Sequence, residues 1–232
     1  MPVANSFKLF GLDHLVALAL TVVVAAVLVV MARRHGEDHP VVNGALQVLA
    51  WLLLLSFPLK FAAFYFSGAR MNEHALPMHL CNWAAIVGGL AILTKRQLFC
   101  ELLYFWGLAA TLQAVITPNL PFGFPHPIFC TFFITHSGVV IAAIVVAFGL
   151  RRSAGPGGVW RAFLWLQVYL VVAVIVNSLT KANYGFLREK PTMQSLIDHL
   201  GDWPYYILGL EAVALLSFVL LNLPFVRRRR VG

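Results

Sequence analysis

The chain has 232 residues, of which 60% are hydrophobic and only 11% are charged, and its mean hydropathy is +0.83. A soluble globular domain carries about 25% charged residues, so this composition excludes one and predicts an integral membrane protein. A net charge of +8 would suggest nucleic-acid binding in a soluble protein. Here Lys and Arg cluster in short loops between apolar runs, which argues against it.

Seven apolar runs, each near the roughly 20 residues that a membrane helix needs, follow one another without the alternation of a membrane β-strand. They predict an all-α fold, a seven-helix transmembrane bundle that forms a single domain over residues 1–232. The predicted spans are residues 12–32, 44–66, 77–94, 98–117, 126–150, 160–180 and 204–224. The first run lacks a basic leader and a small-residue cleavage pattern, so we expect no cleavable signal peptide.

Basic residues gather in the loops on one side of the predicted bundle. They follow spans one, three, five and seven, as Arg33 and Arg34, Lys95 and Arg96, Arg151, Arg152 and Arg161, and Arg227 to Arg230. The other side carries only Lys8, Arg70 and the mixed-charge loop 181–203. Positive loops stay in the cytoplasm, so we expect the N-terminus outside and the C-terminus inside, in a bacterial inner membrane.

Polar side chains within the predicted spans concentrate in the outer half of the membrane. They are His14, Lys60, His79, Asn82, Gln113, His126, His136, Asn177 and Glu211, with Asn183 and Tyr184 beginning the outer loop. The inner half is expected to be nearly bare, with Gln47 and Gln167 as exceptions. Because polar groups in a membrane are costly, this asymmetry predicts one pocket that opens outward rather than a pore.

A thiol, an imidazole and an amide fall within four residues, His79 to Asn82, where the third span begins. Pro77 suits the first turn of a helix, which would put Cys81 about one turn further in. A thiolate attacks acyl carbonyls, and a helix start favours its charge. His79 would face another direction, so the base must come from another span, and we choose His136. Two alternatives stay open, namely a Cys81 that only packs and a His136 that only joins helices.

A metal site is a second interpretation of the same polar residues. Zinc or iron would accept four histidines if they converged, namely His14, His79, His126 and His136. No HxxxH or HExxH spacing supports this, so we expect no metal and no cofactor. Lys60 and Glu211 would suit an ion pair or the binding of a lipid phosphate, and the sequence does not pair them. Cys100 and Cys130 are interpreted as packing residues.

Several segments together resemble the YwaF-type bacterial integral membrane proteins and their eukaryotic relative, transmembrane protein 164. The matching pieces are Leu76 to Asn82, Thr117 to Leu120, Phe124 to His126, Phe132 to His136, Asn177, Asn183-Tyr184, and parts of 190–205. The eukaryotic relative is regarded as an acyltransferase that moves fatty acyl groups between phospholipids, using a Cys and a His. The resemblance implies that Cys81 is this nucleophile and His136 this base.

Together the residues and the resemblance predict a phospholipid acyltransferase or lipase, in which Cys81 carries a thioester and His136 serves as base and then acid. The expected supporting side chains are His79, Asn82, Gln113, Asn177, Asn183, Tyr184, His14, Lys60 and Glu211. A membrane phospholipid or lysophospholipid is the expected substrate, with no nucleic acid and no protein partner. The alternatives are a small-molecule transporter or receptor with an outer polar site, and a metal-dependent membrane hydrolase.

Overall fold

The computed structural model describes residues 6–69, 74–152, 154–191 and 196–231. Its α-helices are α1 (Leu12–His35), α2 (Pro40–Leu54), α3 (Ser56–Phe66), α4 (Leu80–Thr94), α5 (Gln97–Trp106), α6 (Leu112–Ile116), α7 (Pro127–Ile144), α8 (Gly158–Thr180) and α9 (Tyr205–Val231). Two π-helical segments continue α5 and α7, namely η2 (Gly107–Thr111) and η3 (Val145–Gly149), and two 3₁₀ turns follow α8, namely η4 (Tyr184–Phe186) and η5 (Leu196–His199). The all-helical prediction is confirmed for these residues.

Five helical stretches are long and apolar enough to cross a membrane: α1, α5 through α6, α7 with η3, α8, and α9. The pair α2 and α3, bent by 50°, makes a sixth if it acts as one span. The seventh predicted span corresponds to α4, which is apolar but has only 15 residues. That is about 22 Å of helix, against a hydrocarbon core of about 30 Å. The protein is therefore multi-pass, with five to six candidate spans by length.

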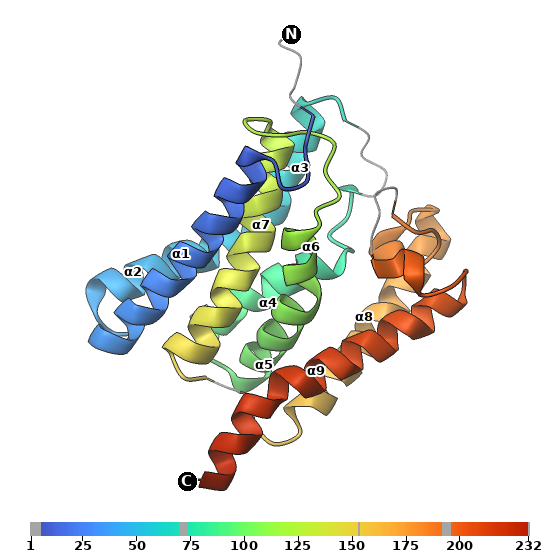
Figure 1. The fold of residues 1–232 in the computed structure, drawn as a ribbon. Helices are drawn as coiled ribbons and strands as arrows, with labels where there is room; N and C mark the ends of the chain where they lie inside the picture. Colours follow the sequence, from blue (N-terminus) through green and yellow to red (C-terminus); the bar gives the residue numbers. More distant parts are fainter. Residues whose placement is uncertain (1–5, 70–73, 153, 192–195, 232) are drawn as a thin grey trace.

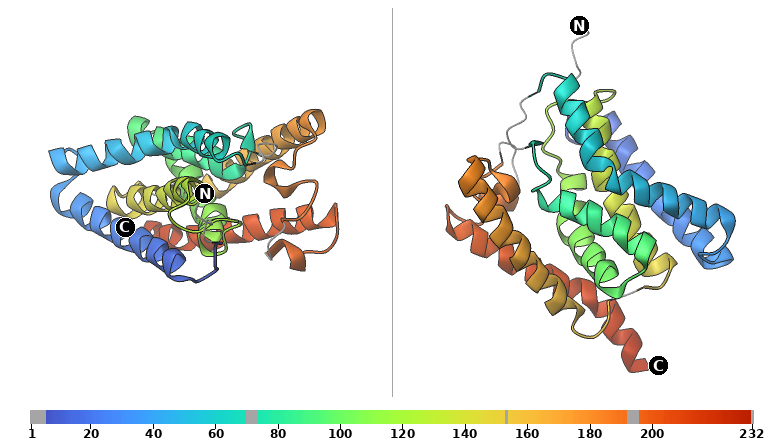
Figure 2. Two further views of the ribbon diagram at one scale, coloured as in Figure 1. Left: turned by 90° about the horizontal axis from the view of Figure 1, so that it is seen from above. Right: turned by 180° about the vertical axis from the view of Figure 1, so that it is seen from behind.

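Helices α5 and α7 form the centre of the bundle (Figure 1). Residues 100–106 of α5 are all buried, as expected for a helix that other helices surround. Helix α7 contacts α1 through α5. Helices α1 to α3 cover one side of this centre and the pair α8–α9 covers the other, as the turned views show (Figure 2). The fold therefore places α4 and α7, which carry Cys81 and His136, side by side.

Small residues bring α4 close to its neighbours. Gly89 lies so near α2 that a Cβ there would be 2.5 Å from the Leu54 side chain, and one at Gly88 would be 2.9 Å from Leu53. Such close approach is how membrane helices gain packing energy in the absence of a hydrophobic drive. The position of α4 in the bundle is fixed by this contact.

The break between α2 and α3 has a clear cause. Pro58, in the first turn of α3, has no N–H to donate to the carbonyl four residues before it, so the helix cannot run straight through. The hydroxyl of Ser56 instead donates to the Leu53 carbonyl at 2.7 Å. The resulting 50° bend re-aims α3 and carries Lys60 with it.

Helix α4 begins at Leu80, so the prediction of a helix start at Pro77 was wrong. The backbone before it is held by tertiary hydrogen bonds instead. The Leu76 N–H donates to the Tyr184 hydroxyl and the Tyr169 hydroxyl donates to the Met78 carbonyl, each at 3.2 Å. These bonds use backbone groups that a helix would need. Cys81 is therefore the second residue of α4 rather than one turn inside it.

The loops that carry the predicted cytoplasmic charges meet at one end of the bundle. Glu37, after α1, accepts from Lys95 at 3.0 Å and from Arg152 at 2.8 and 2.9 Å. Arg33 donates to the Phe148 carbonyl at 2.8 Å. Three of the four predicted basic loops are thus joined. Arg70 and the side chains of Arg227 to Arg230, which carry the rest of that prediction, lie outside the described residues. Which compartment this end faces remains a prediction.

Replacing Glu37 with glutamine is expected to destabilise the protein by about 1 kcal/mol at neutral pH, because the ion pairs are half-buried. The hydrogen bond from Arg152 holds the pKa of this carboxyl below its ordinary value. A lowered pKa stabilises the fold above the ordinary carboxyl range and ceases to do so as acid protonates the group. Thermal unfolding of the two forms should therefore differ at pH 7, and the difference should shrink as the pH falls below the ordinary carboxyl pKa. A gap that widens in acid would contradict this assignment.

Candidate functional site

The thiol of Cys81 lies beside the imidazole of His136, close enough for the two groups to interact. Cys81 is partly exposed at the start of α4, whereas His136 is 8% exposed in the middle of α7. The two come from helices 55 positions apart in sequence, so only the tertiary fold joins them. A thiol against an imidazole is the arrangement in which a base can take the proton of a nucleophile.

The orientation of His136 determines which ring nitrogen faces the thiol. Its Nδ1 lies 2.8 Å from the Phe132 carbonyl. A carbonyl only accepts, so Nδ1 carries the proton, and in the neutral ring Nε2 keeps its lone pair. The ring also stacks on Phe132, with centroids 3.9 Å apart. Phe132 therefore fixes both the tautomer and the plane of the imidazole, leaving Nε2 as the nitrogen able to accept from the sulfur.

The sulfur of Cys81 lies at the first turn of α4. The backbone N–H of Asn82 lies beside the Cys81 sulfur and donates to the His79 carbonyl at 2.9 Å. The first backbone N–H groups of a helix have no partner within the helix, and their dipoles favour a negative charge. The Asn82 side chain is 2% exposed, and its Oδ1 is buried with no hydrogen-bond partner among the described residues. The helix start thus supplies a favourable dipole and an unused acceptor.

Two further ionisable groups extend the site, Lys60 beside Cys81 and His74 beside Lys60 and His79. Lys60, on α3, interacts electrostatically with the thiol and with His74. His74 packs on Phe64, with ring centroids 4.0 Å apart, and lies 6.0 Å from His79. Burial lowers the pKa of His74 to about 4, so its ring is neutral at pH 7. Cys81 therefore has Lys60 and His136 near its thiol, and His74 lies beyond His79 on the Lys60 side.

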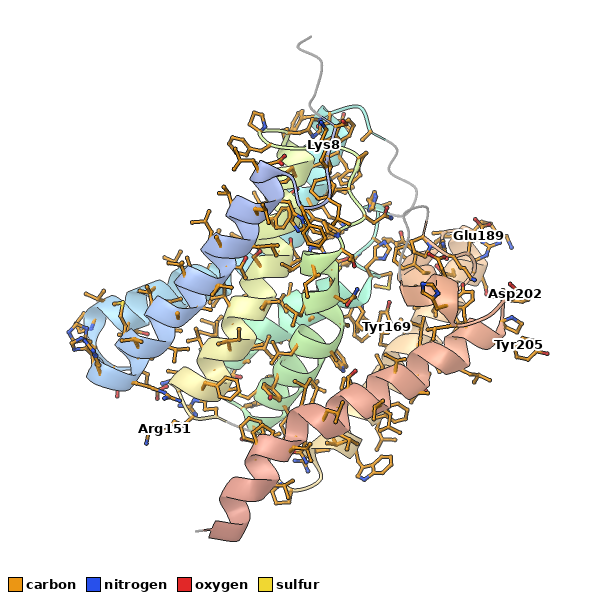
Figure 3. All side chains as sticks on the ribbon, in the orientation of Figure 1. Lys8, Arg151, Tyr169, Glu189, Asp202 and Tyr205 are labelled. Carbon is orange, nitrogen blue, oxygen red and sulfur yellow. The ribbon has the colours of Figure 1, made fainter. Side chains whose placement is uncertain are left out.

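A second set of side chains holds the segment before α4 in place. Tyr169, on α8, reaches toward this segment (Figure 3) and binds the Met78 carbonyl. Tyr184, after α8, binds Leu76. Asn177 in turn fixes Tyr184, because its side chain donates to the Tyr184 carbonyl at 2.9 Å and accepts from the Tyr184 N–H at 2.8 Å. These side chains fix the backbone just before Cys81.

Gly185 is required where the loop after α8 meets this segment. Its backbone has φ +69°, which favours glycine, and a Cβ there would lie 2.6 Å from the Tyr169 hydroxyl. Its N–H donates to Nδ1 of His79 at 3.4 Å. The loop can therefore press against both residues only with glycine at this position.

An Asn177→Leu substitution is expected to destabilise the protein by about 2 kcal/mol, since it leaves the buried N–H and carbonyl of Tyr184 without partners. The loosened Tyr184 should also let Cys81 react faster with a maleimide. Thermal unfolding and the alkylation rate measure the two effects. Ser178→Ala is a matched control, because the exposed Ser178 hydroxyl bonds only to its own helix at Val174. Equal behaviour of the two variants would rule out a positioning role for Asn177.

Four of the predicted supporting residues lie elsewhere, and the described structure gives them no contact with Cys81. Fully buried His14 joins α1 to α6, with Nε2 donating to the Val115 carbonyl at 2.9 Å and Nδ1 accepting from Phe10 at 3.0 Å. Gln113 is exposed and bonds to Thr117 within its own helix.

The other two residues of this group serve the segments after α7. Asn183 folds the loop after α8 on itself, accepting from the N–H groups of Arg188 and Glu189. Glu211 accepts from Gln167, which ties α9 to α8. Of the two roles considered for Lys60 and Glu211, the ion pair is therefore not formed between the described side chains.

The expectation that the inner half of the bundle is nearly bare of polar groups was wrong. Glu101, in α5, is fully buried. It accepts from Arg161 at 2.7 and 2.8 Å, from Gln97 at 2.9 Å and from the Gly155 N–H at 2.8 Å. A carboxylate inside an apolar run is itself a sequence signal that should have marked this residue. Gln97 lies one turn away in α5, but Gly155 and Arg161 were not deducible as partners, because they lie far along the chain at the start of α8.

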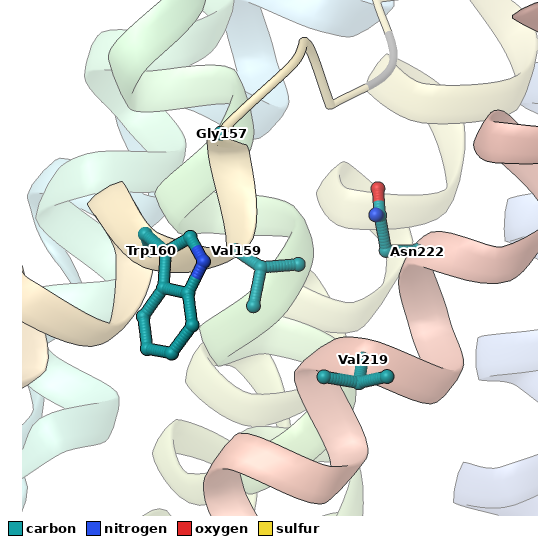
Figure 4. Close-up of a pocket in the computed structure, with 5 residues that line it drawn as sticks. All are labelled: Gly157, Val159, Trp160, Val219 and Asn222. Atoms are coloured by element: carbon teal, nitrogen blue, oxygen red, sulfur yellow. The ribbon is translucent and has the colours of Figure 1, made fainter.

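Two hollows of about 260 Å³ each lie at the opposite end of the bundle from Cys81. One separates α8 from α9 and is lined by Gly157, Val159, Trp160, Val219 and Asn222 (Figure 4). The other is lined by polar groups including Glu37, Asn43 and Lys95. Neither contains a residue that the sequence selected for catalysis. Within the described residues, no three His, Cys, Asp or Glu side chains are grouped to hold a metal ion.

Comparison with known proteins agrees with the resemblance noted in the sequence. The model of the TMEM164 family matches residues 9–222, which is most of the chain. An uncharacterised protein of Treponema pallidum (strain Nichols) is 31% identical over 156 residues, or 67% of this chain. The match spans 64% of that relative, slightly less than two thirds of its length. No solved structure shows a significant match. The chain is therefore a membrane protein that belongs to the TMEM164 family.

Proposed function

We propose that this protein is a membrane acyltransferase that moves fatty acyl chains between phospholipids, with Cys81 as nucleophile and His136 as general base. The observation that carries the proposal is the contact between the Cys81 thiol and the His136 ring. The Phe132 carbonyl holds the ring in the tautomer whose Nε2 can accept the thiol proton. Membership of the TMEM164 family is consistent with a lipid-facing activity in the membrane.

The first half-reaction transfers the acyl group to the enzyme. Nε2 of His136 takes the Cys81 proton as the sulfur attacks the ester carbonyl of a phospholipid. The C–O bond of the tetrahedral intermediate then breaks, and the leaving alkoxide takes the proton from His136. The products are a lysophospholipid and a thioester on Cys81. Each step conserves charge and needs no metal or redox partner.

The second half-reaction regenerates the enzyme. The hydroxyl of an acceptor lysophospholipid gives its proton to His136 and attacks the thioester, and the Cys81 sulfur leaves and is reprotonated. Water in place of the acceptor gives a free fatty acid, which is the lipase reaction. The oxyanion of both intermediates is stabilised by N–H groups of the first turn of α4, with His79 and Asn82 beside them.

The same proposal places the protein in the membrane. The end that carries Glu37, Lys95 and Arg152 faces the cytoplasm of a bacterial inner membrane, and the N-terminus lies outside. All seven predicted spans then cross the bilayer. Because α4 spans only about 22 Å, Cys81 at its start lies below the outer surface, where the ester groups of lipids are found. Irregular backbone is tolerated there only when protein groups bind it, as Tyr169 and Tyr184 do.

The test is an acyl-transfer assay with purified protein in phospholipid micelles. A phospholipid with an isotope-labelled acyl chain is mixed with an unlabelled lysophospholipid that has a different headgroup. Mass spectrometry should find the label on the second headgroup, and withholding the acceptor should yield labelled free fatty acid instead. An absence of both products across a panel of headgroups would contradict the proposal. Solute uptake by reconstituted vesicles without lipid turnover would favour a transporter.

A further inference from the structure

Lys60 occupies an unusual position beside the proposed nucleophile. It lies in the second turn of α3, where the bend after α2 directs it toward α4. The side chain is half-buried near Cys81 and His74, and Phe64, one turn further along α3, packs on the His74 ring with centroids 4.0 Å apart. Neither neighbour carries a negative charge while the thiol is protonated. The site therefore contains a positive charge that its resting neighbours do not balance.

The ion pairs of the described residues leave Lys60 without a carboxylate. Glu37 pairs with Lys95 and Arg152, and Glu101 pairs with Arg161. Each of these pairs lies at the opposite end of α4 or α5 from the thiol. An ammonium in an apolar protein interior is costly unless an anion or hydrogen-bond acceptors compensate it.

Two polar atoms without hydrogen-bond partners lie in the same region as Lys60. Nδ1 of His74 and Oδ1 of Asn82 are both buried and make no hydrogen bond within the described structure. Buried polar atoms are nearly always hydrogen-bonded, so a cluster of exceptions needs an explanation. Asn82 adjoins Cys81 in the chain, and the His74 ring lies 6.0 Å from that of His79, so a bound molecule with several polar atoms could reach both of them and Lys60.

We propose that Lys60 and His74 form an anion subsite that holds the phosphate of a phospholipid while its ester lies at Cys81. The assignment rests on the proposed function and adds the group that recognises the lipid. The Lys60 ammonium offers three donors to phosphate oxygens, and His74 donates one more when its proton is on Nδ1. Asn82 Oδ1 is left to accept from a hydroxyl, such as that of the acceptor lipid. Phosphate is the one anion present in every phospholipid, so this subsite selects phospholipids over neutral glycerides.

The test measures how lipids protect Cys81 from alkylation, in a Cys100→Ser, Cys130→Ser background where it is the remaining thiol. Purified protein in neutral detergent reacts with N-ethylmaleimide while dioleoylphosphatidylglycerol or dioleoylglycerol is titrated in, and intact mass gives the rate. Each variant is normalised to its own rate without lipid. We expect phosphatidylglycerol to protect the parent at about tenfold lower concentration than dioleoylglycerol, as charge-assisted hydrogen bonds to phosphate predict.

In this assay the Lys60→Gln variant should lose the preference for phosphatidylglycerol, Lys60→Arg should keep it, and Lys8→Gln, a distant lysine, should match the parent. A preference that survives in Lys60→Gln would overturn the proposal, and so would an equal loss of protection by both lipids. Protection by inorganic phosphate as effective as by phosphatidylglycerol would show a site for the free anion instead. Alkylation requires no turnover, so the result is readable even if the acyltransferase proposal fails.

Discussion

The Cys81→Ala variant is expected to lose acyl transfer by about 10⁴-fold or more, which is the scale on which removal of a catalytic nucleophile acts. The sulfur is the atom that forms the thioester, and alanine offers nothing to replace it. The fold should be nearly unaffected, because Cys81 sits at a helix start and only its sulfur is removed. Rates of label transfer between phospholipids, measured beside thermal unfolding, separate the two effects.

A variant of Cys130 serves as the matched control. Cys130 is partly exposed, with its sulfur 3.9 Å from the Pro125 carbonyl. Cys130→Ala should therefore keep full transfer activity. His136→Gln should lower the rate by about 10²- to 10⁴-fold, the usual contribution of a general base. Transfer that persists in Cys81→Ala would remove this residue from the mechanism.

Replacing Arg161 with methionine is expected to destabilise the fold by about 3 kcal/mol, because it leaves the buried Glu101 carboxylate without its cation. For a chain of this size the melting temperature should fall by about 6–12 °C. The remaining hydrogen bonds from Gln97 and Gly155 keep the cost at the lower end of the range for buried ion pairs. The substitution lies at the opposite end of the bundle from Cys81, so any loss of activity should follow the loss of folded protein.

A double variant tests whether the uncompensated charge of Glu101 causes the loss of stability in Arg161→Met. With Glu101→Met and Arg161→Met together no unpaired charge remains, and most of the lost stability should return. Thermal unfolding of wild type, both single variants and the double variant completes the cycle. If the double variant were as unstable as Arg161→Met, the defect would come from packing rather than from the uncompensated carboxylate.

Much of the fold was predictable from hydropathy and turn residues. The apolar runs correspond to the helices because length and composition alone determine whether a segment can cross a membrane. The start of α4 was not predictable. Pro77 suits a first helical turn, but two tyrosines far along the chain bind the backbone around it and delay the helix to Leu80. Local helix propensity does not decide the structure where tertiary hydrogen bonds satisfy the same backbone groups.

The candidate site residues that could be predicted are those whose polar side chains are costly to place inside a membrane span. A thiol and an imidazole in apolar spans identified Cys81 and His136, and the structure brings them into contact. Tyr169 gave no signal, because tyrosine is common in membrane helices, and His74 lies in a loop that hydropathy does not describe. Lys60 was selected for its charge. Its closeness to Cys81 depends on the 50° bend between α2 and α3, and Pro58 predicts a break there without giving its angle.

The most direct measurement of the central claim is a search for the acyl-enzyme itself. Purified protein is incubated with phospholipid carrying a labelled acyl chain, quenched in acid, and digested for mass spectrometry. If Cys81 is the nucleophile, it should carry a hydroxylamine-sensitive acyl thioester that is absent from Cys100 and Cys130. This thioester should disappear when an acceptor lysophospholipid is added. Active transfer with Cys81 unmodified at every time point, or an acyl group on another residue, would contradict it.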